Sequence, residues 1–145
     1  MATKLILSAN EANNYVRYLT GISKELTGSS TMFIGLGNMA DGVFTEITPD
    51  AGNNYARTMT HSTGSYPDVL SVDGRRVYNH EQIVFNKVLE TAYTANAIGL
   101  YRLETGGSPY AFGLLEEPLN AVVGSLPLFE RNQLQIIVPD GTEAE

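Results

Sequence analysis

The spacing of apolar residues changes near residue 30 and divides the chain into a short helical part and a longer β part. Apolar residues within 12–22 recur at three- and four-residue intervals, which is the period of one face of a helix. Ser8 and Glu11 have the spacing of a capping box, whose two side chains satisfy free N–H groups of the first turn. The pattern predicts one N-terminal α-helix that ends at Gly21 or Gly28.

After residue 30, short apolar or alternating runs are separated by clusters of Gly, Pro, Asn and Asp, as in a small all-β domain. The strongest hairpin joins residues 96–103 to 110–115 through a loop in which Gly106 and Gly107 supply positive φ angles. The pattern predicts a mainly β fold, a small antiparallel, jelly-roll-like β-sandwich behind the N-terminal helix. The expected strands are residues 31–36, 42–47, 55–60, 82–88, 96–103, 110–115, 120–123 and 133–138.

The length of 145 residues suits a single domain, with an arm and helix over 1–28, a β-sandwich over 29–140 and an acidic tail over 141–145. Hydrophobic residues make up 43% of the chain and charged residues 17%, which argues against disorder. Nine basic residues against sixteen acidic ones give a net charge of -7, which argues against binding to nucleic acid or an anionic membrane. Most of the acidic excess follows Arg102, which predicts a solvated face or one set against a basic partner.

The chain contains no cysteine, which removes disulfides, zinc–thiolate sites and thiol catalysis. Its first apolar run is too short for a secretory signal, and no run approaches the roughly 20 apolar residues that span a bilayer. We therefore expect synthesis in a cytoplasm and no association with membranes.

A glycine-rich segment after the first predicted strand has the form G-x-G-x-x-A, with Gly35, Gly37 and Ala40 at the fixed positions. Dinucleotide binding also needs a helix that begins at the second glycine and an acidic residue about 20 positions further on. Residues 41–49 instead alternate and contain a proline, and position 55 is a tyrosine. We predict a strand followed by a glycine turn and no cofactor site.

Metal-ligating patterns are missing around the two histidines, His61 and His80, which are not part of an H-x-H or H-E-x-x-H sequence. The loops of Asp50, Asp68 and Asp73 lack the spacing of a calcium-binding loop. We expect no metal site, although a site assembled from separate loops stays open as an alternative.

Catalytic patterns are missing as well. The chain has no G-x-S-x-G sequence, and Ser108 has an ordinary role in a hairpin turn. Glu116 and Glu117 are neighbours on a strand and point to opposite faces, so they do not form a natural acid–base pair. We expect no catalytic residues and no enzymatic activity.

The chain has eight tyrosines and five phenylalanines, and their positions divide them into two groups. Those within apolar runs are expected in the core, and those beside polar loops are candidates for contact with a partner, because tyrosine is favoured at interfaces. The predicted core aromatics are Tyr55, Phe85, Tyr101, Phe112 and Phe129, and the interface candidates are Tyr66, Tyr78 and Tyr110.

Several short motifs follow one another in an order that resembles a known family. They are Gly35 in an apolar strand, Glu46-Ile47, a Gly52 loop, Tyr55-Ala56-Arg57, Gln82–Asn86, Ala97-Ile98-Gly99-Leu100-Tyr101, Thr105-Gly106-Gly107, Ala111–Leu115 with Pro118, Val123–Phe129 and Leu134–Val138. This order resembles the small virion structural proteins of tailed bacteriophages, often labelled phage tail fibre or Gp80-like proteins. The chain departs from that family in two places. A Trp that is common ahead of the Ile98 strand is missing, with Tyr93 nearby, and the segment 64–81 is longer than is expected for the family.

The resemblance implies a non-enzymatic virion structural protein, a multi-copy component of the tail, baseplate or fibre apparatus that is made in the host bacterial cytoplasm. Its implied partners are other phage structural proteins and copies of itself, in a homo-oligomer, and it implies no cofactor. A capsid decoration or head-fibre protein on the major capsid lattice is the alternative. A glycan-binding adhesin module that uses the Tyr and Asn loops is a second alternative.

Overall fold

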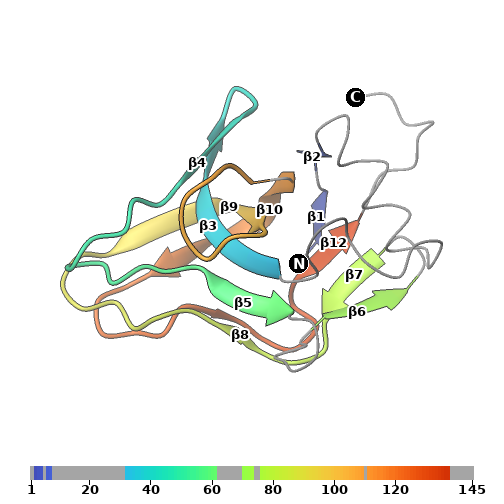
Figure 1. Ribbon diagram of the computed structural model, residues 1–145. Helices are drawn as coiled ribbons and strands as arrows, with labels where there is room; N and C mark the ends of the chain where they lie inside the picture. Colours follow the sequence, from blue (N-terminus) through green and yellow to red (C-terminus); the bar gives the residue numbers. More distant parts are fainter. Residues whose placement is uncertain are drawn as a thin grey trace.

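A computed structural model describes residues 2–4, 6–7, 32–61, 70–73, 76–109 and 111–137. This part of the chain is mainly β and contains no helix (Figure 1). The predicted N-terminal helix and the predicted acidic tail lie outside the described residues, as do the interface candidates Tyr66 and Tyr110. In the ranges that are described, no helix is long and apolar enough to cross a membrane.

The described residues contain twelve strands in three sheets. They are β1 (Ala2–Lys4), β2 (Ile6–Leu7), β3 (Met32–Ala40), β4 (Val43–Glu46), β5 (Thr58–His61), β6 (Leu70–Asp73), β7 (Arg76–Asn79), β8 (Ile83–Val84), β9 (Tyr93–Tyr101), β10 (Ala111–Ala121), β11 (Leu128–Phe129) and β12 (Gln135–Ile137).

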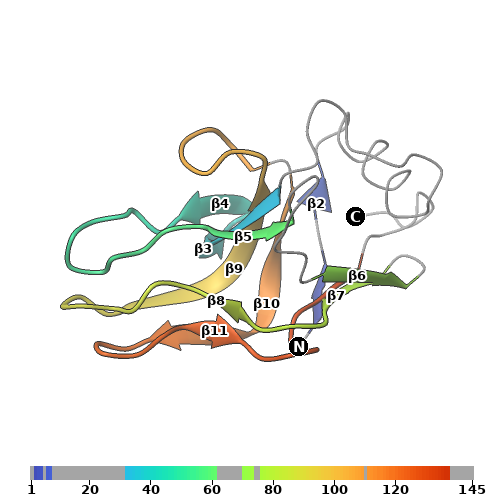
Figure 2. The same cartoon turned by 60° about the horizontal axis from the view of Figure 1, so that its bottom comes forward.

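The largest sheet has six strands in the order β2-β10-β9-β3-β4, with β5 also paired to β3. A four-stranded sheet has the order β1-β12-β7-β6 and lies to one side of the first, and β8 and β11 form a two-stranded sheet (Figure 2). All strand pairs are antiparallel except β1 with β12. The predictions of an antiparallel β fold and of a hairpin that joins β9 to β10 are therefore confirmed.

The core lies against one face of the six-stranded sheet. Alternate residues of its central strands point to this face, as the two-residue period of a strand requires, and they are fully buried. They form one cluster with apolar residues in and beside the two-stranded sheet, where the rings of Phe85 and Phe129 meet edge to face with centroids 6.2 Å apart. The central members of the cluster are Ile34, Leu36, Ile98, Leu100, Ile83, Phe85 and Phe129.

The core assignment of the aromatic residues is confirmed for Tyr55, Phe85, Tyr101 and Phe129, which are buried. It is wrong for Phe112, which is only half-buried. The pairing of Phe112 with Gly99 places it on the face opposite the core, where its ring stacks on Phe44 at a centroid distance of 5.8 Å.

The G-x-G-x-x-A segment is strand from end to end, since β3 runs through it and ends at Ala40. The chain then reverses at Asp41 and Gly42, whose φ angles of 53° and 79° are both positive, as a two-residue type I′ hairpin requires. The strand is confirmed, but it ends four residues later than expected, and the turn lies at Asp41-Gly42, beyond the glycines of the G-x-G-x-x-A segment.

Other strand boundaries differ from the prediction. The two strands expected over 110–115 and 120–123 are one strand, β10, whose register with β9 shifts between Leu114 and Leu119. Pro118 lies within this shift, where its missing N–H breaks no regular ladder bond. The strand expected over 82–88 is reduced to β8, and β1, β2, β6, β7 and β11 were not predicted.

Candidate functional site

One edge of β3 is shared by two strands, and the gap between them is closed by side chains. β5 pairs with the first residues of β3 and β4 pairs with the last, so the middle of this edge has no complete partner strand. There the backbone N–H of Leu36 donates to the hydroxyl of Tyr55 at 2.8 Å, and the Leu36 carbonyl accepts from Ile47 N at 2.9 Å. A tyrosine hydroxyl thus takes the place of a backbone carbonyl in the ladder.

A carboxylate lies above this gap. Glu46 is the last residue of β4, and its Oε2 accepts from the Tyr55 hydroxyl at 2.6 Å and from Arg57 Nε at 2.8 Å. Its Oε1 accepts from Arg57 Nη2 at 2.8 Å, so the two side chains form a bidentate pair. The Arg57 side chain is 4% exposed and that of Glu46 is 20% exposed. The pair joins the end of β4 to the segment that leads into β5.

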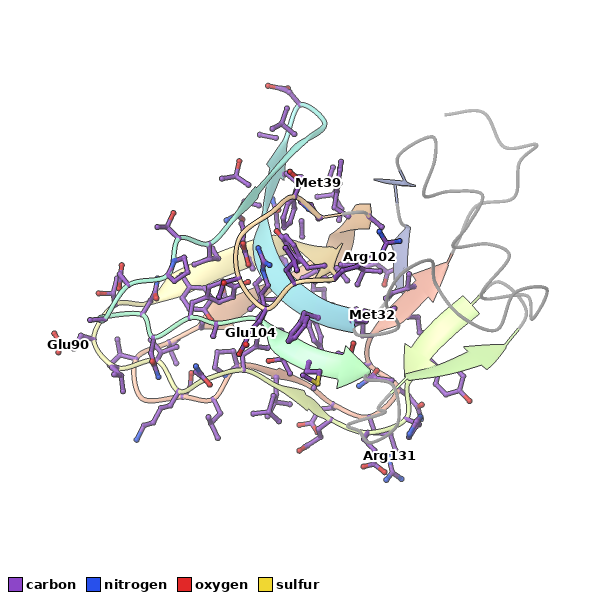
Figure 3. The ribbon with its side chains drawn as sticks, viewed as in Figure 1. Met32, Met39, Glu90, Arg102, Glu104 and Arg131 are labelled. Carbon is purple, nitrogen blue, oxygen red and sulfur yellow. The ribbon has the colours of Figure 1, made fainter. Side chains whose placement is uncertain are left out.

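The remaining contacts of Arg57 tie down the β9–β10 loop. Its Nη1 donates to the carbonyl oxygens of Leu103 at 2.8 Å and Gly106 at 2.9 Å. Its guanidinium carbon lies 3.4 Å from the centre of the Tyr101 ring, which is a cation–π contact. Glu46, Tyr55, Arg57 and Tyr101 are called the polar lock below. Figure 3 labels Glu104 within the restrained loop, which passes in front of β3 in that view.

The polar lock depends on a glycine beneath it. A Cβ atom on Gly35 would lie 2.8 Å from both Glu46 Oε2 and the Tyr55 hydroxyl, and 2.9 Å from Tyr101 Cε1. Real Cβ atoms do not approach other atoms so closely, so any larger residue would displace the carboxylate. Gly35 therefore provides the space in which three polar side chains converge.

A turn just before Tyr55 positions its side chain. The side-chain oxygen of Asn53 accepts from the backbone N–H groups of Asp50 at 3.1 Å and Tyr55 at 2.9 Å, and its amide donates to the Thr48 carbonyl at 2.9 Å. The carboxylate of Asp50 in turn accepts from Asn53 N at 2.7 Å. These bonds use the backbone groups of the loop, which explains why β5 begins at Thr58 and not at residue 55 as predicted.

Electrostatics fix the charge state of the carboxylate and the guanidinium. Burial alone would raise the pKa of Glu46, but hydrogen bonds from Arg57 and Tyr55 and the charge of Arg57 outweigh it, so this pKa is lowered. Burial would lower the pKa of Arg57, but the hydrogen bond and the charge of Glu46 raise it instead. Both groups therefore stay ionised in the neutral range.

The two phenols of the polar lock are held in the neutral form. Burial, followed by the hydrogen bond and the charge of Glu46, raises the pKa of Tyr55. Burial and the charge of Glu46 also raise the pKa of Tyr101, to about 12. General acid–base catalysis needs a group that titrates near the working pH, and the shifts of all four groups lead away from it. The arrangement suits a permanent structural contact.

The structure describes only some of the residues that were considered for chemistry from the sequence. The backbone of Asp73 is described at the end of β6 and His61 at the end of β5, while Asp68 lies outside the described residues. Within the ranges that the structure covers, no group of three His, Asp or Glu side chains is arranged to hold a metal ion. Glu116 and Glu117 are both exposed.

Sequence reasoning missed the polar lock as a site, although its members were visible. Glu46, Tyr101 and the Tyr55-Ala56-Arg57 run occurred in three separate motifs, and no contact between them was predicted. The available signal was the Tyr-x-Arg spacing, since residues two apart on an extended segment point to the same side. That spacing places the hydroxyl and the guanidinium where one carboxylate reaches both.

Comparison with models of known protein families finds none that matches this chain. Comparison with curated proteins finds no relative either.

Proposed function

We propose that this protein is a non-enzymatic structural component of a tailed-bacteriophage particle, present in many copies in the tail, baseplate or fibre apparatus. Its work there is to make protein–protein contacts with other phage structural proteins and with copies of itself. The proposal rests on one observation: separate motifs of the family resemblance meet in the polar lock. Gly35, Glu46, Tyr55, Arg57 and Tyr101 come from four such motifs; Arg57 contacts Glu46 and Tyr101, Tyr55 contacts Glu46, and Gly35 provides the space for them.

This convergence supports a structural role because the bonds of the polar lock point inward. Both oxygens of the Glu46 carboxylate accept hydrogen bonds from Tyr55 or Arg57. The other contacts of the Arg57 guanidinium are with two carbonyls of the β9–β10 loop and with the Tyr101 ring. A reaction site would need groups of this kind aimed at a substrate. Here they hold β4, the entry to β5 and the β9–β10 loop in one shape.

The same proposal includes the finer architecture. The six-stranded sheet would form one layer of a small jelly-roll-like sandwich, and β8 with β11 would belong to the facing layer. The shared cluster that joins Ile34 and Ile98 to Ile83 and Phe129 supports this arrangement. A shell of this kind presents loops at both ends of its strands for contact with neighbours.

The test is the protein content of purified particles. Phage particles purified on a density gradient are digested, and this protein is quantified against the major capsid protein with isotope-labelled peptides. A fixed copy number per particle is expected, with dozens of copies for a tail component. Hundreds of copies would replace the tail assignment by capsid decoration, and protein found only in the soluble lysate would overturn the proposal.

A further inference from the structure

One end of the domain exposes a group of large apolar side chains. Three connections reach this end, namely residues 47–57, 85–92 and 122–127, and they extend together at the left of Figures 1 and 2. Two of them carry apolar residues that are 49–55% exposed. These residues are Leu89, Val122, Val123 and Leu126, and they are called the apolar tip below. The two loops that carry them are hydrogen-bonded to each other, and exposed apolar residues gathered in this way mark interaction sites.

The apolar tip is held in place by backbone hydrogen bonds between its loops. Val88 N donates to the Ser125 carbonyl at 3.0 Å, and Gly124 N donates to the Val88 carbonyl at 2.8 Å. Glu90 N and Thr91 N both donate to the carbonyl of Gly52, at 2.7 and 3.1 Å. The tip is therefore ordered before any partner arrives, which lowers the entropic cost of binding.

Charges of both signs lie beside the apolar tip. Lys87 and Glu90 are exposed and lie on either side of Leu89 in the same loop, and Figure 3 labels Glu90 at the outermost end of the domain. In a two-fold contact residue i of one copy meets residue j of the other, and j meets i. Such a contact can pair each Lys87 with the Glu90 of the other copy. The chain as a whole has a net charge of -7 and Asp50 is also exposed at this end, so Lys87 is the residue whose charge reduces the repulsion between two copies here.

We propose that the apolar tip is a self-association surface and that its occupant is a second copy of this chain. Leu89, Val122, Val123 and Leu126 form the centre of the contact, and Lys87 and Glu90 form two reciprocal ion pairs at its rim. The inference rests on the proposed function in one respect, since a multi-copy particle is the setting in which such a contact acts. A stable interface uses about 20–30 residues a side, so this smaller contact is weak alone and gains strength from multiplicity.

The first experiment measures association of the full chain by sedimentation velocity from micromolar to millimolar concentration. A reversible monomer–dimer equilibrium is expected for the natural chain. The double variant Val122→Thr and Val123→Thr keeps the side-chain shapes and is expected to weaken dimerisation at least tenfold. Leu114→Thr is the matched control, because Leu114 is equally exposed at 51% but lies on β10 away from the tip, and its dimerisation constant should be unchanged.

A charge-exchange experiment tests the identity of the occupant. Lys87→Glu and Glu90→Lys should each weaken self-association severalfold, because each places like charges opposite one another. Mixing the two variants should restore dimers, since every rim pair in the mixed dimer again has opposite charges. A natural chain that stays monomeric at millimolar concentration, or a mixture no better than its components, would overturn the inference.

Two further outcomes separate this inference from its alternatives. Co-sedimentation with phosphatidylcholine vesicles in the absence of dimers would assign the apolar tip to a lipid surface and overturn the inference. The Lys87→Glu variant can also be introduced into the phage. If particles contain this variant at the natural copy number and bind it as tightly as the natural chain, the inference is overturned and the proposed function stays intact. If the protein forms dimers but is absent from purified particles, the result would support self-association through the apolar tip and overturn the proposed function.

Discussion

Replacing Glu46 by glutamine removes one negative charge from the polar lock with almost no change in shape. The natural carboxylate accepts three hydrogen bonds, from the Tyr55 hydroxyl and from two nitrogens of Arg57. A glutamine side chain has one accepting oxygen in place of two, so its NH2 group must face at least one donor. The guanidinium of Arg57, which is 4% exposed, is then left without a counter-charge.

The expected cost follows from these contacts. Removing one partner of a buried ion pair costs about 3–5 kcal/mol, because the remaining charge stays buried without compensation. Glu46 is 20% exposed, so water recovers part of that loss, and we expect about 3 kcal/mol at neutral pH. At this chain length such a loss lowers the melting temperature by roughly 10 °C.

The measurement is chemical denaturation of the natural chain and of Glu46→Gln at neutral pH. Glu81→Gln is the matched control, because Glu81 pairs with Arg131 at 3.4 Å while their side chains are 57% and 65% exposed. An exposed pair contributes about 0–1 kcal/mol, so the control should stay close to the natural chain. Equal effects of the two substitutions would refute the role assigned to the polar lock.

The pH dependence of the same pair of proteins gives an independent check. The pKa of Glu46 is lower in the folded chain than its ordinary value of 4.5, so unfolding takes up a proton in acid. Its contribution to stability is therefore complete above the ordinary value and is lost as the pH falls through the lower, folded value. The stability difference between the natural chain and Glu46→Gln should shrink over this range. A difference that stays constant from neutral pH to about pH 3 would contradict the assignment.

Three further predictions concern the glycine, the phenols and a buried amide. Gly35→Ala should destabilise the fold by about 1–3 kcal/mol through overpacking, and a melting temperature equal to that of the natural chain would contradict this. In a titration followed by phenolate absorbance, Tyr55 and Tyr101 should ionise only above pH 10 or on unfolding. The stability of the fold should therefore fall as the pH rises from about 10 toward about 12, and ionisation of all tyrosines near pH 10 would contradict this. Asn79→Ala should lower the free energy of unfolding by about 2–4 kcal/mol, because the buried Asn79 side chain accepts from Leu134 N and donates to the carbonyls of Glu81 and Glu130. The control Asn120→Ala, at an exposed position, should lower it by less than about 0.5 kcal/mol.

Local signals in the sequence were sufficient for the parts of the fold that are built locally. The β9–β10 hairpin was predicted because Gly106 and Gly107 mark its loop, and both have positive φ angles, 73° and 71°. The β6–β7 hairpin, in which Asp73 pairs with Arg76, was not predicted, although Leu70 and Val72 alternate with polar residues and Gly74 follows them in the sequence.

Other features depend on long-range structure and could not be predicted. The polar lock exists because β4 and β5 share one edge of β3 and leave a gap beside Leu36. Nothing in the spacing of Glu46 and Arg57 along the chain fixes how those strands pair. The continuity of β10 was hidden for a similar reason, since Glu116-Glu117-Pro118 looks like a break and the strand is held on both sides of it by β9.

Cryo-electron microscopy of the purified phage particle would show whether this domain occupies a fixed position on the tail apparatus. The account predicts density into which this β domain fits in symmetric, repeated copies on the tail apparatus, with the β9–β10 loop in the conformation set by Arg57. A particle map whose density is fully explained by other proteins, with no position for this domain, would contradict the account.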